Sequence, residues 1–102
     1  MAFTVILDET KNQYQLLDEQ TQIGVADFHL ENQEMVLDHT LVDAEYSGQG
    51  LGEKLIFFVL DDLLAKKYKV VPRCWFVAKV IKKYPEKYLE LVSLENKKLL
   101  GL

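Results

Sequence analysis

The chain has 102 residues, 49% of them hydrophobic and 27% charged, a balance typical of a soluble globular protein that excludes a disordered or fibrous chain. This length holds one modest core, so residues 1–102 are expected to form a single domain. No apolar run approaches the roughly 20 residues of a membrane span, and the N-terminus lacks a basic signal-peptide start, so no membrane partner is expected. The single cysteine cannot form an internal disulfide, which favours a reducing, cytoplasmic location.

The net charge of −4 is divided unevenly along the chain. Residues 1–50 carry one base and ten acids, a net −9, whereas residues 51–102 carry eleven bases and six acids, a net +5. The net negative charge of the whole chain argues against a nonspecific nucleic-acid partner, because such binding depends on neutralising phosphates with positive charge. The basic second half suits a small polyanion such as a cofactor phosphate, or is simply a solvated lysine-rich face.

Four short runs rich in apolar and β-branched residues fill the first half of the chain, at 3–7, 13–17, 23–30 and 35–42. Only short polar segments separate them. Because parallel neighbours would need long crossovers, these runs predict an antiparallel meander.

The period of the apolar residues changes after residue 50. A single helical stripe then predicts a long helix over 50–68. The stripe consists of Leu51, Leu55, Ile56, Val59, Leu60, Leu63 and Leu64. A fifth strand is expected at 69–71.

The residues after the fifth strand predict shorter elements. Pro72 closes that strand, because proline cannot donate into a ladder. A second helix is expected at 75–83, and a short one at 86–92 that Pro85 opens. The tail 94–102 has little periodicity and is expected to be loosely held. The predicted fold is therefore α/β (α+β), with an antiparallel-rich mixed sheet, a long central helix and C-terminal helices.

The stretch 38–53, DHTLVDAEYSGQGLGE, joins the fourth strand to the long helix through Gly48, Gly50 and Gly52. A helix start leaves backbone N–H groups free, and with the helix dipole behind them they attract an anion such as phosphate. The alternative is a plain tight turn. No Gly-Lys-Ser/Thr follows, so the stretch is not a P-loop. We interpret it as a turn for the pyrophosphate of a nucleotide-like cofactor.

Four motifs in order resemble the GNAT superfamily of acetyl-CoA-dependent N-acetyltransferases, and within it the short, YjdJ-type branch. They are the glycine loop 47–52 (SGQGLG), the His-Thr strand 39–42 (HTLV), the segment 70–77 (VVPRCWFV) and the segment 82–86 (KKYPE). The resemblance covers about 13–92.

This resemblance implies a small GNAT-like fold that transfers an acetyl group from acetyl-CoA to an amine. Glycine-loop amides would hold the pyrophosphate, and the backbone of 41–43 would run beside the pantetheine. Helical spacing and charge add three lysines that could approach the adenosine phosphates. The cofactor-binding candidates are thus Leu41, Val42, Asp43, Gly48, Gln49, Gly50, Leu51, Gly52, Lys79, Lys82 and Lys83. No metal ligand set is expected.

Cys74 and His39 are the catalytic candidates. Cys74 opens a predicted helix beside Arg73, and both features favour a thiolate. The resemblance suggests that Cys74 lies near the thioester and takes the acetyl group as a covalent intermediate; the alternative is a small buried packing residue. His39 is expected on one strand face with Leu37 and Leu41, either as a core histidine or as a group that orients the site or accepts a proton.

Two residues depart from the family pattern. Ser47 stands where Arg or Gln is usual, and Tyr84 replaces a histidine. These departures leave a noncatalytic CoA-binding or interaction module as the alternative function. Because the chain is short for this superfamily, the acceptor groove is expected to be open, which suits a protein or peptide amine. Trp75 and Phe76 either line the pantetheine channel or pack in the core.

Overall fold

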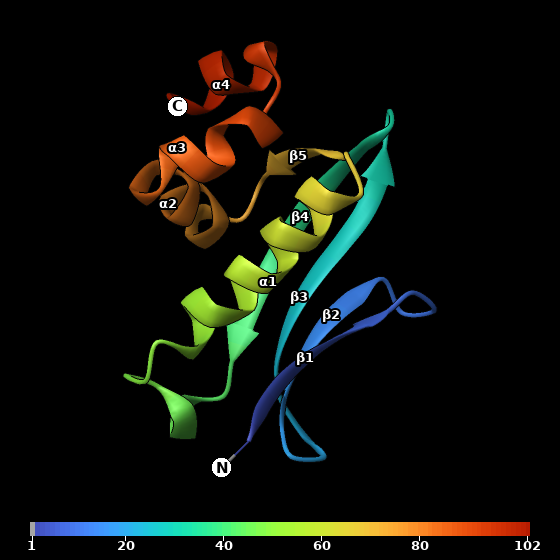
Figure 1. The fold of residues 1–102 in the computed structure, drawn as a ribbon, viewed down its shortest axis with the longest axis vertical. Coiled ribbons are helices and arrows are strands. Elements are labelled where there is room, and N and C mark those ends of the chain that lie inside the picture. The colour runs from blue at the N-terminus through green and yellow to red at the C-terminus, as the bar shows by residue number, and fades with distance from the viewer. Residues whose placement is uncertain (1) are drawn as a thin grey trace.

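The protein is described by a computed structural model that covers residues 2–102; Met1 lies outside the described residues. Figure 1 shows the sheet with helices beside it, and the sheet has five strands. In chain order the elements are β1 (Phe3–Asp8), β2 (Gln13–Asp18), β3 (Thr21–Glu31), β4 (Glu34–Val42), η1 (Ala44–Tyr46), α1 (Leu51–Ala65), β5 (Lys69–Pro72), α2 (Trp75–Lys83), α3 (Pro85–Tyr88), η2 (Leu89–Leu91) and α4 (Leu94–Leu100).

The sheet has the strand order β1-β2-β3-β4-β5. The first four strands pair antiparallel with their neighbours in sequence, whereas β5 lies parallel to β4. The long connection through α1 makes that parallel pair possible. The expected mixed α/β fold with an antiparallel-rich sheet is therefore confirmed.

A bulge interrupts β4 at Asp38. Asp27 pairs with His39 and the next residue, Phe28, pairs with Leu37, so Asp38 has no partner on β3. Side chains of a strand alternate between faces, and an extra residue shifts this alternation. Leu37 is 1% exposed in the core while His39 is exposed to solvent. The shared face predicted for these two residues is wrong, and so is the interpretation of His39 as a core histidine.

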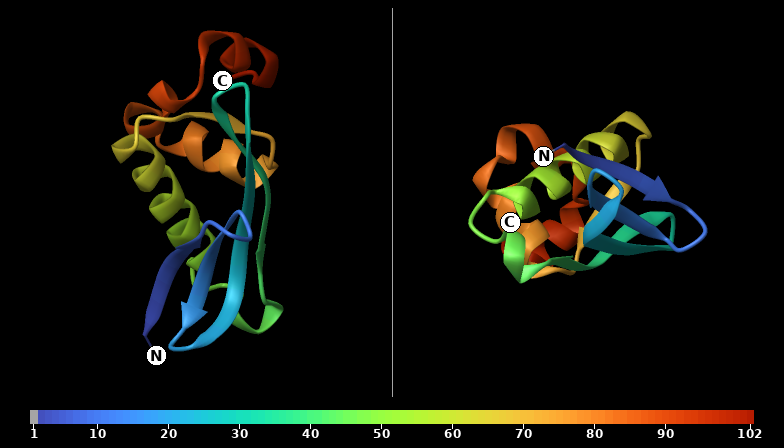
Figure 2. Two further views of the ribbon diagram at one scale, coloured as in Figure 1. Left: turned by 90° about the vertical axis from the view of Figure 1, so that its right-hand side faces the viewer. Right: turned by 90° about the horizontal axis from the view of Figure 1, so that it is seen from below.

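Helix α1 packs on one face of the sheet, as Figure 2 shows. The predicted stripe supplies its buried side chains, and only Leu64 of that stripe is partly exposed. Burial of each such side chain contributes about 1.5–3 kcal/mol relative to exposure. From the sheet, Tyr14, Leu16, Ile23, Ala26 and Leu37 join the same core.

Helix α1 ends at Ala65, three residues before the predicted end. The N–H of Tyr68 donates to the carbonyl of Leu63 and the N–H of Lys67 to that of Leu64, both at 3.1 Å. Lys67 adopts a left-handed conformation with φ of 63°. This pair of bonds is the Schellman motif, which turns the chain back toward β5 without the usual glycine.

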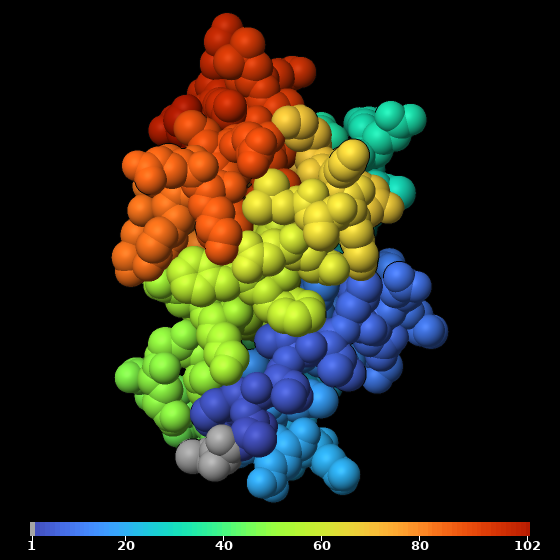
Figure 3. All heavy atoms as spheres, in the orientation of Figure 1, coloured from blue at the N-terminus to red at the C-terminus, as the bar shows by residue number. Residues whose placement is uncertain are grey.

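The C-terminal helices lie at the opposite end of the body from the N-terminal strands (Figure 3). Helix α2 has the predicted bounds, and the expected helix at 86–92 is divided into α3 and η2. The tail forms α4, a helix that was not expected from the sequence pattern of 94–102. Ser93 caps α4 through a 3.3 Å bond from the N–H of Asn96. How firmly this tail is held stays a prediction. Among residues 2–102, no helix is both long enough and apolar enough to cross a membrane.

Candidate active site

The glycine loop leaves a row of free amides at the start of α1. Gly48 and Gly50 have φ of 80° and 72°, a region that side-chain-bearing residues rarely adopt. Gly50 is the N-cap, and its carbonyl accepts the first helical bond from the N–H of Lys54 at 3.1 Å. The N–H groups of 51–53 therefore have no partner within the helix. This is the amide arrangement that binds anions at helix starts.

A groove of about 260 Å³ opens beside these amides. We call it the Cys74 groove; it is lined by Thr40, Val42, Tyr46, Ser47, Gly48, Gly50, Leu51, Gly52, Cys74, Trp75 and Phe76. A Cβ at Gly52 would lie 3.3 Å from the Phe76 ring. Gly52 thus allows α1 and α2 to approach closely, so that Phe76 forms a wall of the groove.

Cys74 is held at the junction between β4 and α2. Its N–H donates to the carbonyl of Leu37 at 2.9 Å, and it is the N-cap of α2. Its side chain is partly buried, with Sγ 3.6 Å from the hydroxyl oxygen of Thr40. Sequence reasoning missed Thr40. The His-Thr motif includes this position, but the bulge determines whether His39 or Thr40 contacts the cysteine.

The free edge of β4 runs along the Cys74 groove. The N–H of Asp43 donates to the carbonyl of Ile23 on β3 at 2.8 Å. Alternate residues of a strand direct their backbone groups to opposite neighbours, so Thr40 and Val42 direct theirs away from β3. The pairing with β5 ends at Leu37. Beyond that point β4 presents unpaired backbone groups that an extended ligand with amides can meet.

The Cys74 groove brings together about half of the predicted site residues. Six of them line it: Val42, Gly48, Gly50, Leu51, Gly52 and Cys74. Seven do not: His39, Leu41, Asp43, Gln49, Lys79, Lys82 and Lys83. The roles assigned to all of them stay predictions.

The side chain of Glu53 in the first turn of α1 is bound from α2. The Lys83 ammonium lies 3.3 Å from one carboxylate oxygen, and the Tyr84 hydroxyl donates to the other at 2.9 Å. The bond from Tyr84, with a further contribution from Lys83, lowers the pKa of Glu53. Lys79 lies over the Trp75 ring at 5.9 Å, and Lys82 is exposed. Lys83 therefore neutralises the charge of Glu53, the acid in the first turn of α1.

Trp75 stands at the rim of the Cys74 groove. Its side chain is 72% exposed, and its ring meets that of Phe76 edge-on at 5.8 Å. The interpretation of Trp75 as a core residue is wrong. It is the only tryptophan in the chain, so tryptophan emission comes from the rim of this groove and can be used to follow binding there.

A larger hollow of about 500 Å³ lies away from the glycine loop, between Tyr14, Phe28 and Lys66 among others. The Tyr14 hydroxyl and the Lys66 ammonium at this hollow are already paired. The Tyr14 hydroxyl donates to Asp62 at 2.6 Å, and Lys66 binds the same carboxylate at 2.8 Å. Burial, reinforced by Asp62, raises the pKa of Tyr14 above its usual range. The smaller Cys74 groove is the better candidate because it lies beside the backbone amides at the start of α1, which have no partner within the helix.

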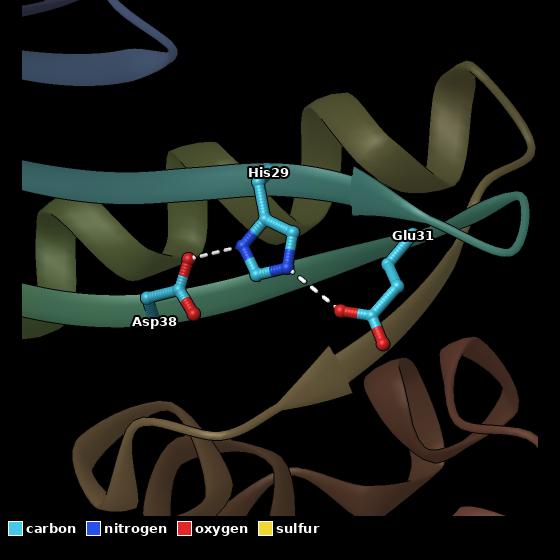
Figure 4. A network of polar contacts seen from close by, with 3 residues as sticks. All are labelled: His29, Glu31 and Asp38. Atoms are coloured by element: carbon cyan, nitrogen blue, oxygen red, sulfur yellow. Dashed lines mark hydrogen bonds and ion pairs between the residues drawn. The ribbon is translucent and has the colours of Figure 1, made fainter.

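His29 lies between two carboxylates on the sheet face away from α1 (Figure 4). Its Nδ1 is 2.6 Å from Asp38 and its Nε2 is 2.9 Å from Glu31. Only the protonated imidazolium can donate both bonds. The bonds to Glu31 and then to Asp38 raise the pKa of His29 above 6.5. His29 thus ties the bulge residue Asp38 to β3.

The His29→Gln variant tests this contact. A raised folded-state pKa means that the imidazolium stabilises the fold fully below pH 6.5 and that this stability is lost as the pH rises through the folded pKa. The wild type should therefore exceed the variant in urea midpoint at about pH 6, and the difference should shrink by about pH 8. The effect should be small, since the His29 side chain is 40% exposed. A difference that does not change with pH would contradict the assignment.

The chain is similar to known proteins in sequence and in fold. Residues 13–91 match the family model described as GCN5-related N-acetyl-transferase. No curated protein matches the chain. Among solved structures it resembles the ribosomal-protein-S18-alanine N-acetyltransferase from Escherichia coli, at 27% identity and a TM-score of 0.51. That likeness covers 58% of this chain and 38% of the other. With a sheet, glycine loop and groove of this kind and a family match over most of its length, the chain belongs to the GCN5-related N-acetyltransferases.

Proposed function

We propose that this protein transfers an acetyl group from acetyl-CoA to an amine. The observation that carries the proposal is the Cys74 groove itself: free amides of 51–53 open at one end, and the Cys74 thiol lies within it. An anion site joined to a nucleophilic group by an unpaired strand edge suits a long ligand with phosphates at one end and a reactive group at the other.

In this proposal acetyl-CoA follows the Cys74 groove. The amides of 48–52 bind the pyrophosphate. Ser47 lacks the side-chain contact that Arg or Gln would add, so this binding depends on the backbone. The pantetheine amides meet the free edge of β4 near Val42, and the thioester lies near Cys74. Lys79 and Lys82 serve the adenosine phosphates, and Lys83 does so only if it leaves Glu53.

Two routes of transfer are open. In the direct route the amine nitrogen attacks the thioester carbonyl, CoA leaves as a thiolate, and the amine proton passes to solvent. In the covalent route the Cys74 thiolate attacks first, so that a new S–C bond forms while the bond to CoA breaks. An amine then attacks the acetyl-cysteine, and the Cys74 thiolate leaves.

The acceptor in this proposal is a protein or peptide amine. The openness of the groove, whose rim carries the exposed Trp75, leaves room for a large acceptor. The E. coli enzyme that shares the fold takes its name from a protein acceptor, an alanine of ribosomal protein S18. The short, YjdJ-type branch and a cytoplasmic location, as the four motifs and the single cysteine indicate, are part of the same proposal.

Titration with acetyl-CoA tests the proposal in two steps. Binding should change the emission of Trp75 and raise the melting temperature, because a ligand of the folded state stabilises it. Labelled acetyl-CoA with a panel of amines and peptides should then transfer label to an amine. Binding without transfer over a broad panel would instead support a noncatalytic CoA-binding module. No change in emission or melting temperature would overturn both.

Gly50→Ala should weaken CoA binding and lower stability by about 1 kcal/mol, because alanine is strained at positive φ. Gly101 provides a matched control: its φ of 70° is nearly that of Gly50 at 72°, and a Cβ at either meets nothing within 4 Å. Both alanine variants should lose similar stability in urea unfolding. Only Gly50→Ala should raise the Kd for CoA measured by Trp75 emission. Equal Kd values in the two variants would contradict a role for the glycine loop in binding.

A further inference from the structure

We propose that Thr40 is the residue that positions the Cys74 thiol in the groove. This inference rests on the proposed function, because it assigns a role within the same site. It differs from the sequence-based choice of His39, the preceding residue. The contact that points to it is the 3.6 Å approach between Cys74 Sγ and the Thr40 hydroxyl oxygen.

The bulge at Asp38 is the reason that Thr40 faces the groove. Ala26 pairs with Thr40, and Ala26 is buried in the core on the α1 side of the sheet. Residues paired across two strands share a face, so Thr40 is directed to the same side. The neighbouring His39 is exposed and does not line the Cys74 groove. Without the extra residue, these two side chains would exchange faces.

Cys74 is fixed at two points that have different effects. The bond from its N–H to the carbonyl of Leu37 fixes the backbone, and any residue at position 74 would keep it. The contact with Thr40 is the one hydrogen bond found for its sulfur among the described residues. This contact selects one of the staggered side-chain positions. Thr40 thus decides where the sulfur lies in relation to the groove.

The Thr40 hydroxyl can serve both protonation states of the thiol. A hydroxyl accepts a hydrogen bond from the S–H, and it donates one to the sulfur after the proton has left. Donation to the thiolate holds the sulfur in place while it attacks a thioester. Valine has the shape of threonine but offers neither bond, whereas serine keeps the hydroxyl.

The test compares Thr40→Val and Thr40→Ser with Thr4→Val, a matched change at an exposed threonine of β1. The loss of one hydrogen bond should lower kcat for acetyl transfer about five- to tenfold in Thr40→Val, with KM for acetyl-CoA unchanged. Thr40→Ser should recover most of the rate. Alkylation of the single cysteine by iodoacetamide at neutral pH, followed by mass spectrometry, should slow by a similar factor in Thr40→Val alone.

The outcomes separate this inference from the proposed function. Alkylation needs no turnover, so it decides the role of Thr40 even if the wild type transfers no acetyl group. The inference would be overturned if Thr40→Val kept both the wild-type kcat and the wild-type rate of alkylation. An equal loss of kcat and of alkylation rate in Thr4→Val would also overturn it, because replacing a threonine on any strand would then have the same effect. A change in KM or in the Trp75 titration, with kcat kept, would assign Thr40 to cofactor binding and overturn it as well.

Discussion

Replacing Cys74 by alanine is expected to abolish acetyl transfer and to leave CoA binding unchanged. The alanine variant keeps the N–H bond to the carbonyl of Leu37 and the N-cap backbone of α2, because neither uses the side chain. The free amides of 51–53 lie on α1 and are also kept. What disappears is the sulfur beside Thr40. If the acetyl group passes through that sulfur, the loss of kcat should exceed about a hundredfold.

Three measurements check this expectation. The Trp75 titration with CoA should give the wild-type Kd, which shows that the groove is intact. Labelled acetyl-CoA without an acceptor should leave label on the Cys74 peptide of the wild type and none on the variant. Transfer to an amine should be lost. Full activity in the variant would remove Cys74 from the mechanism and leave the direct attack of the amine on the thioester as the route.

The long helix and the meander could be predicted because each follows from a local pattern. A stripe from Leu51 to Leu63 can be buried only as a helix, and short polar turns such as 9–12 leave only antiparallel neighbours. The glycine loop could be predicted for the same reason. Gly50 takes a conformation that few other residues adopt, and the start of a helix always leaves free amides.

The face of each β4 residue could not be predicted, because the bulge at Asp38 is not a local signal. Strict alternation put His39 with Leu37, and one extra residue exchanged it for Thr40. The bulge accompanies the pairing of Leu37 with Phe28 and the bond between His29 and Asp38, and both partners lie on the neighbouring strand β3. Bulges often redirect a side chain next to an active site. Here a bulge decides which half of the His-Thr motif meets the cysteine.

The missed tail helix had signals at both ends. Ser93 is a good N-cap, and Gly101 takes the left-handed conformation that ends a helix. These two end signals did not lead to a predicted helix because the tail lacks an apolar stripe between them. The structure accordingly buries no residue of α4. The charge pattern also does not show which lysines are paired. Lys83 was predicted to approach the cofactor phosphates, whereas in the structure it binds Glu53.

Leu55→Ala is expected to cost about 3 kcal/mol of stability, within the range of about 2–5 kcal/mol found for buried leucines. Leu55 is 0% exposed and lies in the stripe of α1 that packs on the sheet. A domain of this size has only about 5–15 kcal/mol in total, so the urea midpoint should fall sharply. Circular dichroism follows the unfolding of the helices.

Leu99→Ala is the matched control, because it is the same chemical change at a side chain that is 75% exposed. It should alter stability by no more than about 0.5 kcal/mol. Equal losses in the two variants would show that the stripe of α1 does not form the core. The folded fraction of Leu55→Ala should still bind CoA, since the groove is lined by other residues. The stability of α1 and the chemistry of the loop that begins it can therefore be separated: the helix holds the amides in place, and the amides bind the ligand.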